Sequence, residues 1–388
     1  MPTIAEVPES HPGVSSKGSI TMVAVQDLIA DFGRPPFDGE SITAGFLAKV
    51  VRDEVLEKLG LCVARPQVGR YLYSRFFALI SDATGGTPYV NWGHPGMWRE
   101  RTYRTLPPAP VIWVRVDNLD AFVRNVLPKI DGRFVLVTTD ADNAPWEHAP
   151  EAARRLLECE KVFHWFADQC DLPSHPKVTP VPIGIPYPYR YDCPASYNDC
   201  LDKDLFGHYR IVPPRVATFD DRLAKLIAAR KSPVQRKLVA FADFVLNDSP
   251  SRVGRSETRR DIARKLSACK AVTFLDRPVA RFSLYHCYSN VAFVISPLGR
   301  AFDCYRTWEA LLMGAIPITK RSPLTGLYDQ YPIVTVDDWS EVTEDNLERW
   351  MERFGGLCQS AEVEHRLRFG HWSDLVLAKR DALRRQIA

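Results

Sequence analysis

Short apolar segments that alternate with amphipathic ones constrain the fold of this chain more than any other feature. In the first half these segments are VIWVRV (111–116), FVLVT (134–138), KVFHWF (161–166) and KVTPVPI (177–183). They are rich in β-branched and aromatic residues, and strands of this kind between helices are typical of βαβ units with a parallel sheet. The first half is therefore predicted to be an α/β unit, with an additional amphipathic helix at 41–59.

The alternation is more regular in the second half. Strands are predicted at 237–242, 271–275, 291–296, 316–319 and 333–336, and helices at 256–269, 281–288 and 305–313. This order predicts a Rossmann-like α/β domain. Ser256 is the expected N-cap of the first of these helices. Pro317 cannot donate to a sheet ladder, so its strand is expected to begin there or to lie at an edge.

A segment rich in Pro and Tyr, which begins at IPYPYRYDCP, interrupts the alternation between the two halves. It predicts the main domain boundary, because linkers commonly have such a composition. The expected organisation is a flexible tail (1–20), an N-terminal domain (21–190), a linker region (191–236), a second domain (237–340) and C-terminal helices (341–388). The C-terminal helices are expected at 344–354 and 361–386.

Length and composition exclude several classes of protein. The chain has 388 residues, a length that suits two domains, and its net charge of +3 is too small for general nucleic-acid binding. Its nine cysteines are scattered and lack a CxxC pair, which favours reduced thiols over disulfides or zinc. Neither a signal peptide nor an apolar run of membrane-spanning length is evident. A cytoplasmic protein is expected, with peripheral membrane contact left open.

The junction between the predicted strand 291–296 and the following helix is the best candidate for a binding site. The strand ends at Ser296, a turn with Gly299 follows, and the helix is expected to begin near Asp303 and to end at Gly314. Ligands of open α/β sheets bind beyond the carboxyl ends of strands, and a helix N-terminus favours phosphate.

Arg306 and Glu309 are three residues apart and share one face of this predicted helix. Arg306 could hold a diphosphate through a bidentate contact, and Glu309 could accept hydrogen bonds from both hydroxyls of a ribose. Arg300 in the turn is a second phosphate candidate. The alternative is an ordinary solvated ion pair at this spacing, while Trp308 is expected to face the core.

The run SPLGRAFDCYRTWEALLMGAIPI resembles the C-terminal domain of exostosin-like glycosyltransferases, which show a Ser-Pro-x-Gly turn, a D-x-x-R-x-W-E-A helix and a G-x-I-P-I strand. The resemblance implies a GT-B-like α/β fold, with two Rossmann-like domains facing a cleft and C-terminal helices packing back on the N-terminal domain. It also implies that Glu309 binds the ribose of a nucleotide sugar and that Arg306 meets its phosphates, with Ser296, Gly299 and Arg300 in the same site.

Two other segments resemble related proteins more weakly, namely 134–186 and 237–260. The second of these adds four phosphate-binding candidates in an arginine-bearing loop and helix: Arg252, Arg255, Arg259 and Arg260. For each of them the alternative is a solvated basic helix face.

The resemblance implies a hexosyl- or pentosyltransferase that moves a sugar from a nucleoside diphosphate sugar, with UDP favoured, to a hydroxyl of a saccharide or glycoconjugate. No cofactor and no metal are expected, because arginines and a helix N-terminus can stabilise the departing diphosphate. An inverting enzyme also needs a general base. Asp140 and Asp142 after the strand 134–138 are the first candidates, and His94 and Asp117 are rivals.

Other interpretations stay open at this point. The spacing DAD (140–142) is also that of metal-dependent transferases. Another GT-B enzyme, such as a fucosyltransferase or a nucleotide-sugar epimerase, would share the nucleotide half-site. A non-catalytic protein that binds nucleotides or carbohydrates would share it as well.

Overall fold

A computed structural model describes residues 22–23, 40–41, 68–84, 103, 105–187, 201–203, 209–211, 216–246, 257–276, 279 and 281–387, and the statements below concern these residues. The predicted helix beyond Ser41, the predicted N-cap Ser256 and the candidates His94, Arg252 and Arg255 lie outside them.

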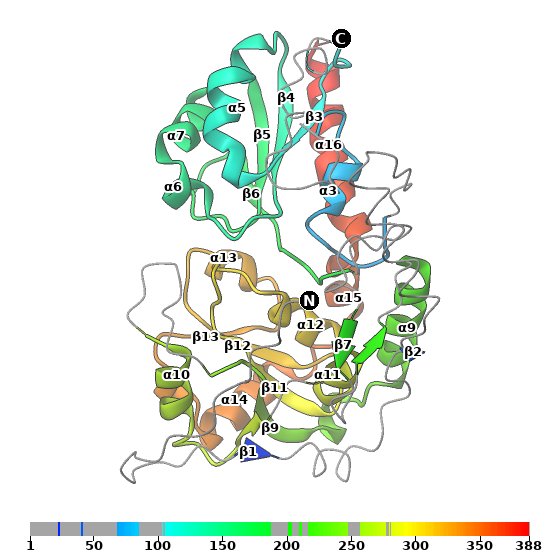
Figure 1. Cartoon of the computed structure of the whole chain (residues 1–388), viewed down its shortest axis with the longest axis vertical. Helices are drawn as coiled ribbons and strands as arrows, with labels where there is room; N and C mark the ends of the chain where they lie inside the picture. The colour runs from blue at the N-terminus through cyan, green and yellow to red at the C-terminus, as the bar shows by residue number, and fades with distance from the viewer. Residues whose placement is uncertain are drawn as a thin grey trace, which may run out of the picture.

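The first unit is a parallel four-stranded sheet with the order β3-β4-β5-β6. Its strands are β3 (Val111–Val114), β4 (Phe134–Thr138), β5 (Val162–Ala167) and β6 (Val178–Pro180). Helices α5 (Leu119–Asn125) and α7 (Pro150–Glu158) cover one face, and α16 (Phe369–Ile387) covers the other (Figure 1). Because both faces are covered, every side chain of β4 is buried, which explains its unbroken apolar sequence.

The second unit is a parallel six-stranded sheet with the order β1-β10-β9-β11-β12-β13. Its strands are β1 (Met22–Val23), β9 (Lys237–Ala242), β10 (Val272–Leu275), β11 (Val291–Ile295), β12 (Ile316–Lys320) and β13 (Val334–Val336). Its helices are α10 (Arg259–Leu266), α11 (Arg281–Tyr288), α12 (Tyr305–Leu312), α13 (Thr325–Tyr328) and α14 (Glu344–Phe354). Phe241 of β9 and Val294 of β11 belong to one apolar cluster, whereas their sequence neighbours Ala240, Ala242, Phe293 and Ile295 belong to another, as expected for a sheet covered on both faces.

The described residues also form a small sheet and four further α-helices. They are a three-stranded antiparallel sheet of β2 (Glu40–Ser41), β8 (Tyr209–Ile211) and β7 (Leu201–Lys203), and the helices α3 (Phe76–Leu79), α6 (Pro145–His148), α9 (Val216–Ala229) and α15 (Ala361–Arg366). No helix among the described residues is long and apolar enough to span a membrane.

Three local predictions need correction. Pro317 lies inside β12, which is an interior strand between β11 and β13, and the ladder with β13 begins only at Ile318. Helix α10 begins at Arg259, and its N-cap is Thr258, whose hydroxyl accepts the N–H of Asp261 at 3.1 Å. The predicted C-terminal helix 361–386 is two helices, because α15 ends at Arg366 and α16 begins at Phe369.

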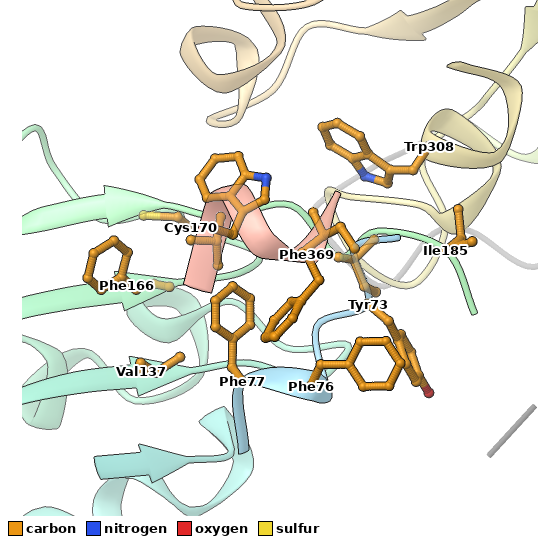
Figure 2. Packing of buried hydrophobic residues seen from close by; sticks show 14 of the residues in the cluster. Tyr73, Phe76, Phe77, Val137, Phe166, Cys170, Ile185, Trp308 and Phe369 are labelled. Carbon is orange, nitrogen blue, oxygen red and sulfur yellow. The ribbon is translucent and has the colours of Figure 1, made fainter. Parts of the chain in front are cut away.

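The C-terminal helices return to the first unit, as predicted. The ring of Phe369 at the start of α16 packs edge-on against Phe76 and Phe77 of α3, at centroid distances of 5.5 and 5.3 Å (Figure 2). The same apolar cluster reaches from Val137 of β4 to Trp308 of α12, so one core joins both units. Two parallel α/β units with returning C-terminal helices confirm the predicted GT-B-like fold class, while the exact domain boundaries remain a prediction.

Candidate functional site

The strand order of the second sheet creates a topological switch between β9 and β11. After β9 the chain goes to β10 on one side, and it later returns to β11 on the other side. In open parallel sheets, ligands bind beyond the carboxyl ends of the strands that flank such a switch. Asp243 directly follows β9, and residues 296–304, the β11–α12 turn, directly follow β11. The predicted binding segment therefore lies at the switch.

Arg306 in the first turn of α12 is held at this switch by Asp243. Its Nε donates to Oδ1 of Asp243 at 2.6 Å, and the hydroxyl of Tyr288 on α11 donates to Oδ2 at 3.0 Å. Burial lowers the pKa of Arg306, but Asp243, Tyr288 and Cys304 together outweigh burial, so the pKa of this guanidinium is raised above its ordinary value. Arg306 is therefore a fixed cation with a defined orientation.

Glu309 lies one helical turn further and is only 8% exposed. Its Oε1 accepts the hydroxyl hydrogen of Tyr285 on α11 at 2.8 Å. Burial raises the pKa of this carboxyl group, while Arg281 and the Tyr285 hydrogen bond lower it. Arg306 thus reaches Asp243, which Tyr288 of α11 also contacts, and Glu309 reaches Tyr285 of α11, in agreement with the prediction that Arg306 and Glu309 share a helix face.

Arg259 brings a second cation to the β11–α12 turn. Its Nη2 lies 4.0 Å from the position that a β-carbon on Gly299 would occupy, and that β-carbon would also come within 3.2 Å of the Cys304 sulfur. Burial and the nearby charge of Arg306 lower the pKa of Arg259. Within the described part of the chain, Arg259 has no hydrogen-bond or ion-pair partner. The neighbouring candidate Arg260 is exposed.

The other two candidates of the turn have different surroundings. Ser296 is fully buried, and its hydroxyl shares a hydrogen bond of 2.9 Å with that of Thr307, which ties β11 to α12. Arg300 is exposed, and its Nη1 lies 4.0 Å from Oδ2 of Asp142 in the first unit. The structure therefore brings Asp142, which follows β4, close to the turn that follows β11.

Asp140 is buried at the end of β4 between two arginines. Arg75 Nε donates to its Oδ1, and Arg115 Nη1 lies 3.6 Å from its Oδ2. Burial raises the pKa of Asp140, and the two arginines oppose that rise. The side chain of Asp142 is 49% exposed, so it is the more accessible of the two predicted carboxylates. The rival Asp117 accepts hydrogen bonds from Arg115 and Asn143 at 2.7 and 2.6 Å.

Asp168, directly after β5, holds the backbone of Asp140. Its Oδ2 accepts the backbone N–H of Asp140 at 2.8 Å, where Asp140 has a φ of 67°. Its Oδ1 has no hydrogen-bond partner among the described residues. Burial raises the pKa of Asp168 well above its ordinary value, and the N–H of Asp140 opposes that rise.

Asp303 connects the β11–α12 turn to the first unit. Its carboxylate accepts hydrogen bonds from the N–H of Ile183 at 2.8 Å, from Trp308 Nε1 and from the hydroxyl of Tyr328. Burial raises the pKa of Asp303 to about 6, against these donors. Contrary to the prediction, Asp303 is not the N-cap of α12, since Cys304 occupies that position. The carboxylate of Asp303 accepts hydrogen bonds from buried groups instead.

The sequence missed three residues of the site: Asp243, Asp168 and Arg75. The first two share a signal, since each is the polar residue that directly follows an apolar strand, in FADF and FADQ. Arg75 belongs to a segment for which the sequence offered no interpretation. No group of three or more His, Cys, Asp or Glu side chains in the described ranges is arranged to hold a metal ion.

Comparisons with known proteins add little to this geometry. No family model matches the sequence, and no curated protein does either. An α,α-trehalose 6-phosphate synthase from Burkholderia multivorans is a structural neighbour, with 12% identity and a TM-score of 0.37 over 77% of this chain and 79% of that one. A UDP-forming α,α-trehalose-phosphate synthase from Burkholderia vietnamiensis has 12% identity and a TM-score of 0.32 over 76% and 74%.

An α-glucosyltransferase (AGT) solved in complex with UDP is a further neighbour, with 12% identity and a TM-score of 0.26 over 71% of this chain and 78% of that one. Similarity this low does not assign a function to the chain. The chemistry of the residues at the switch therefore carries the functional conclusion.

Proposed function

We propose that the protein is a glycosyltransferase that binds a nucleoside diphosphate sugar, with UDP favoured, at the switch between β9 and β11. The observation that carries the proposal is Arg259, a half-buried guanidinium beside Gly299 that has no hydrogen-bond or ion-pair partner among the described residues. A cation that is partly removed from water and has no hydrogen-bond or ion-pair partner favours the binding of an anion.

The charges around this position support an anion with more than one negative charge. Arg259 and Arg306 both lie near Asp243, and this carboxylate is engaged by Arg306. The β11–α12 turn and the N-terminus of α12 add a partial positive charge at the same place. A diphosphate between the two arginines would balance this site, and Glu309, one turn along α12, would bind the ribose hydroxyls.

The reaction of the proposed enzyme needs a proton acceptor on the other side of the anomeric carbon. In an inverting reaction the acceptor hydroxyl attacks this carbon, its proton goes to the base, and the bond to the diphosphate oxygen breaks. The bonding electron pair then leaves with the diphosphate, where the arginines stabilise it. Asp142 is the proposed base, because it is half exposed and lies beside Arg300, whereas Asp140 is buried between Arg75 and Arg115. The acceptor is proposed to be a saccharide or glycoconjugate.

Nucleotide binding tests the proposal directly. UDP, GDP and CMP are compared by thermal shift and calorimetry, with uridine as the control that lacks phosphate. One nucleoside diphosphate should raise the free energy of unfolding by about 2.7 kcal/mol at a hundredfold excess over its Kd. If none of the nucleotides stabilises the protein, the switch is not a nucleotide site.

Arg259→Gln tests the observation that carries the proposal. A hydrogen bond to a charged group contributes about 1.5–3 kcal/mol, so nucleotide affinity should fall by roughly 10- to 150-fold. Arg264→Gln is the matched control, since it removes the same charge from an exposed position of α10. Equal affinity of the two variants would exclude Arg259 from the phosphate site.

A further inference from the structure

Gln169 has an unusual backbone conformation and lies between the segment that follows β4 and the β11–α12 turn. It is fully buried two residues after the end of β5, and its φ is 47°. This left-handed region is unfavourable for a residue with a β-carbon, and glycine would adopt it more easily. A buried glutamine held there indicates that its side chain is needed.

The side chain of Gln169 is bonded to the backbone of Asp303. Its Oε1 accepts the N–H of Asp303 at 2.7 Å, and its Nε2 donates to the carbonyl oxygen of Asp303 at 3.4 Å. Asp303 lies in the β11–α12 turn, two residues before the first residue of α12. The first unit therefore holds both the N–H and the C=O of one turn residue in a buried environment.

Asp168, the residue before Gln169, also bonds to backbone, in this case in the segment that follows β4 and carries the proposed base. Asp168 accepts the N–H of Asp140, two residues before the proposed base Asp142. Two consecutive residues directly after β5 thus bond to the backbone of Asp140, which follows β4, and to the backbone of Asp303 in the β11–α12 turn. This dipeptide therefore contacts the backbone on both sides of the candidate site.

We propose that Gln169 is a positioning residue of the first unit that sets the β11–α12 turn for the nucleoside diphosphate. The nucleotide site then depends on both units, because the side-chain amide of Gln169 in the first unit orders the turn that binds the phosphates. This inference rests on the proposed function, since it names a determinant of the same site.

Two substitutions test the role of Gln169. Gln169→Met keeps most of the volume but removes both hydrogen bonds with Asp303. Gln169→Gly also removes them, and it relieves the left-handed backbone, which protects folding. The matched control is Cys170→Ala, which alters the adjacent buried residue of the apolar core. UDP and GDP affinities are measured by calorimetry well below the melting temperature, and amide hydrogen exchange is followed over residues 297–304.

Both Gln169 variants should bind the preferred nucleotide at least tenfold more weakly than the wild type, with faster exchange over 297–304 in the free protein. Cys170→Ala should lower the melting temperature and leave affinity and exchange unchanged. Wild-type affinity in Gln169→Gly would overturn this inference and leave the proposed function intact. Failure of the wild type to bind UDP or GDP would overturn both.

Discussion

Glu309 shows how a single side chain at the switch depends on groups that are distant in sequence. The spacing of Arg306 and Glu309 on one helix was visible in the sequence because i and i+3 residues share a helix face. Their partner Asp243 follows β9 and their partner Tyr285 lies on α11, and only the strand order brings these residues together. The sequence could therefore predict which residues face the site, but it could not predict what orients them.

Replacing Glu309 with Gln should separate binding from stability. Gln keeps an oxygen that can accept the Tyr285 hydroxyl, and it removes a buried carboxylate whose charge burial disfavours, as the raised pKa of Glu309 indicates. The free energy of unfolding should change by less than about 1 kcal/mol. Nucleotide affinity should fall about tenfold, because a charged acceptor for the ribose hydroxyls is lost.

The ligand 2′-deoxy-UDP supplies the control for the Glu309 prediction. The wild type should bind it more weakly than UDP, whereas Glu309→Gln should distinguish the two ligands much less. A variant that discriminates between them as well as the wild type does would show that Glu309 does not contact the ribose.

Helix α12 carries the site on one face and the contact between the units on the other. Its existence and its end near Gly314 followed from the sequence, and Gly314 has the left-handed φ of 76° that favours glycine there. Its beginning was predicted less well, because Asp303 resembles an N-cap. The carboxylate of Asp303 is instead used by Trp308, Tyr328 and Ile183, which are tertiary contacts that a local sequence pattern cannot reveal.

Trp308 should stabilise this element through both packing and its hydrogen bond. It is fully buried, its ring packs edge-on against Tyr331 at 5.0 Å, and its Nε1 donates to both oxygens of Asp303 at 2.8 and 2.9 Å. Trp308→Ala should lower the free energy of unfolding by about 3–5 kcal/mol, as measured by urea denaturation.

Trp339 offers a matched comparison within the same unit. It is also almost fully buried, but its Nε1 has no hydrogen-bond partner among the described residues. Trp308→Phe should therefore cost about 1–3 kcal/mol more than Trp339→Phe, because only the first substitution deprives a buried carboxylate of a donor. Equal losses would mean that the Trp308–Asp303 hydrogen bond contributes nothing to stability.

At the scale of the whole molecule, the sequence predicted the two parallel units well because short apolar strands between helices leave few alternatives. The resemblance also implied that the C-terminal helices return to the first unit. The break between α15 and α16 was not predicted, since apolar periodicity continues across it. The position of α16 is determined by tertiary packing, because this helix lies on β4 and β5. Buried groups of the sheet therefore lie close to charged side chains of the helix. His164 on β5 is one such group.

His164 should make the packing of α16 sensitive to acid. Burial, with a contribution from the charge of Lys379 on α16, lowers the pKa of His164 to about 4 from its ordinary 6.5, and its Nε2 shares a hydrogen bond of 2.8 Å with Thr179. Between pH 6.5 and pH 4 the unfolded chain binds a proton that the folded chain does not, so stability falls as the pH falls. From pH 7 to pH 5 the loss at this residue should be roughly 2 kcal/mol.

Unfolding curves at pH 7 and pH 5 test this expectation in variants, since other groups, such as Asp303 with its raised pKa, contribute equally to all of them. His164→Gln retains a polar partner for Thr179 and cannot be protonated, so its stability should decline less between the two pH values. Lys379→Gln should reduce the decline partly, because it removes the repelling charge and leaves the burial. His148→Gln, at an exposed position of the same unit, should follow the wild type. If His164→Gln loses as much stability as the wild type does, the acid sensitivity of the molecule originates elsewhere, and the contact between α16 and β5 is not its pH-dependent element.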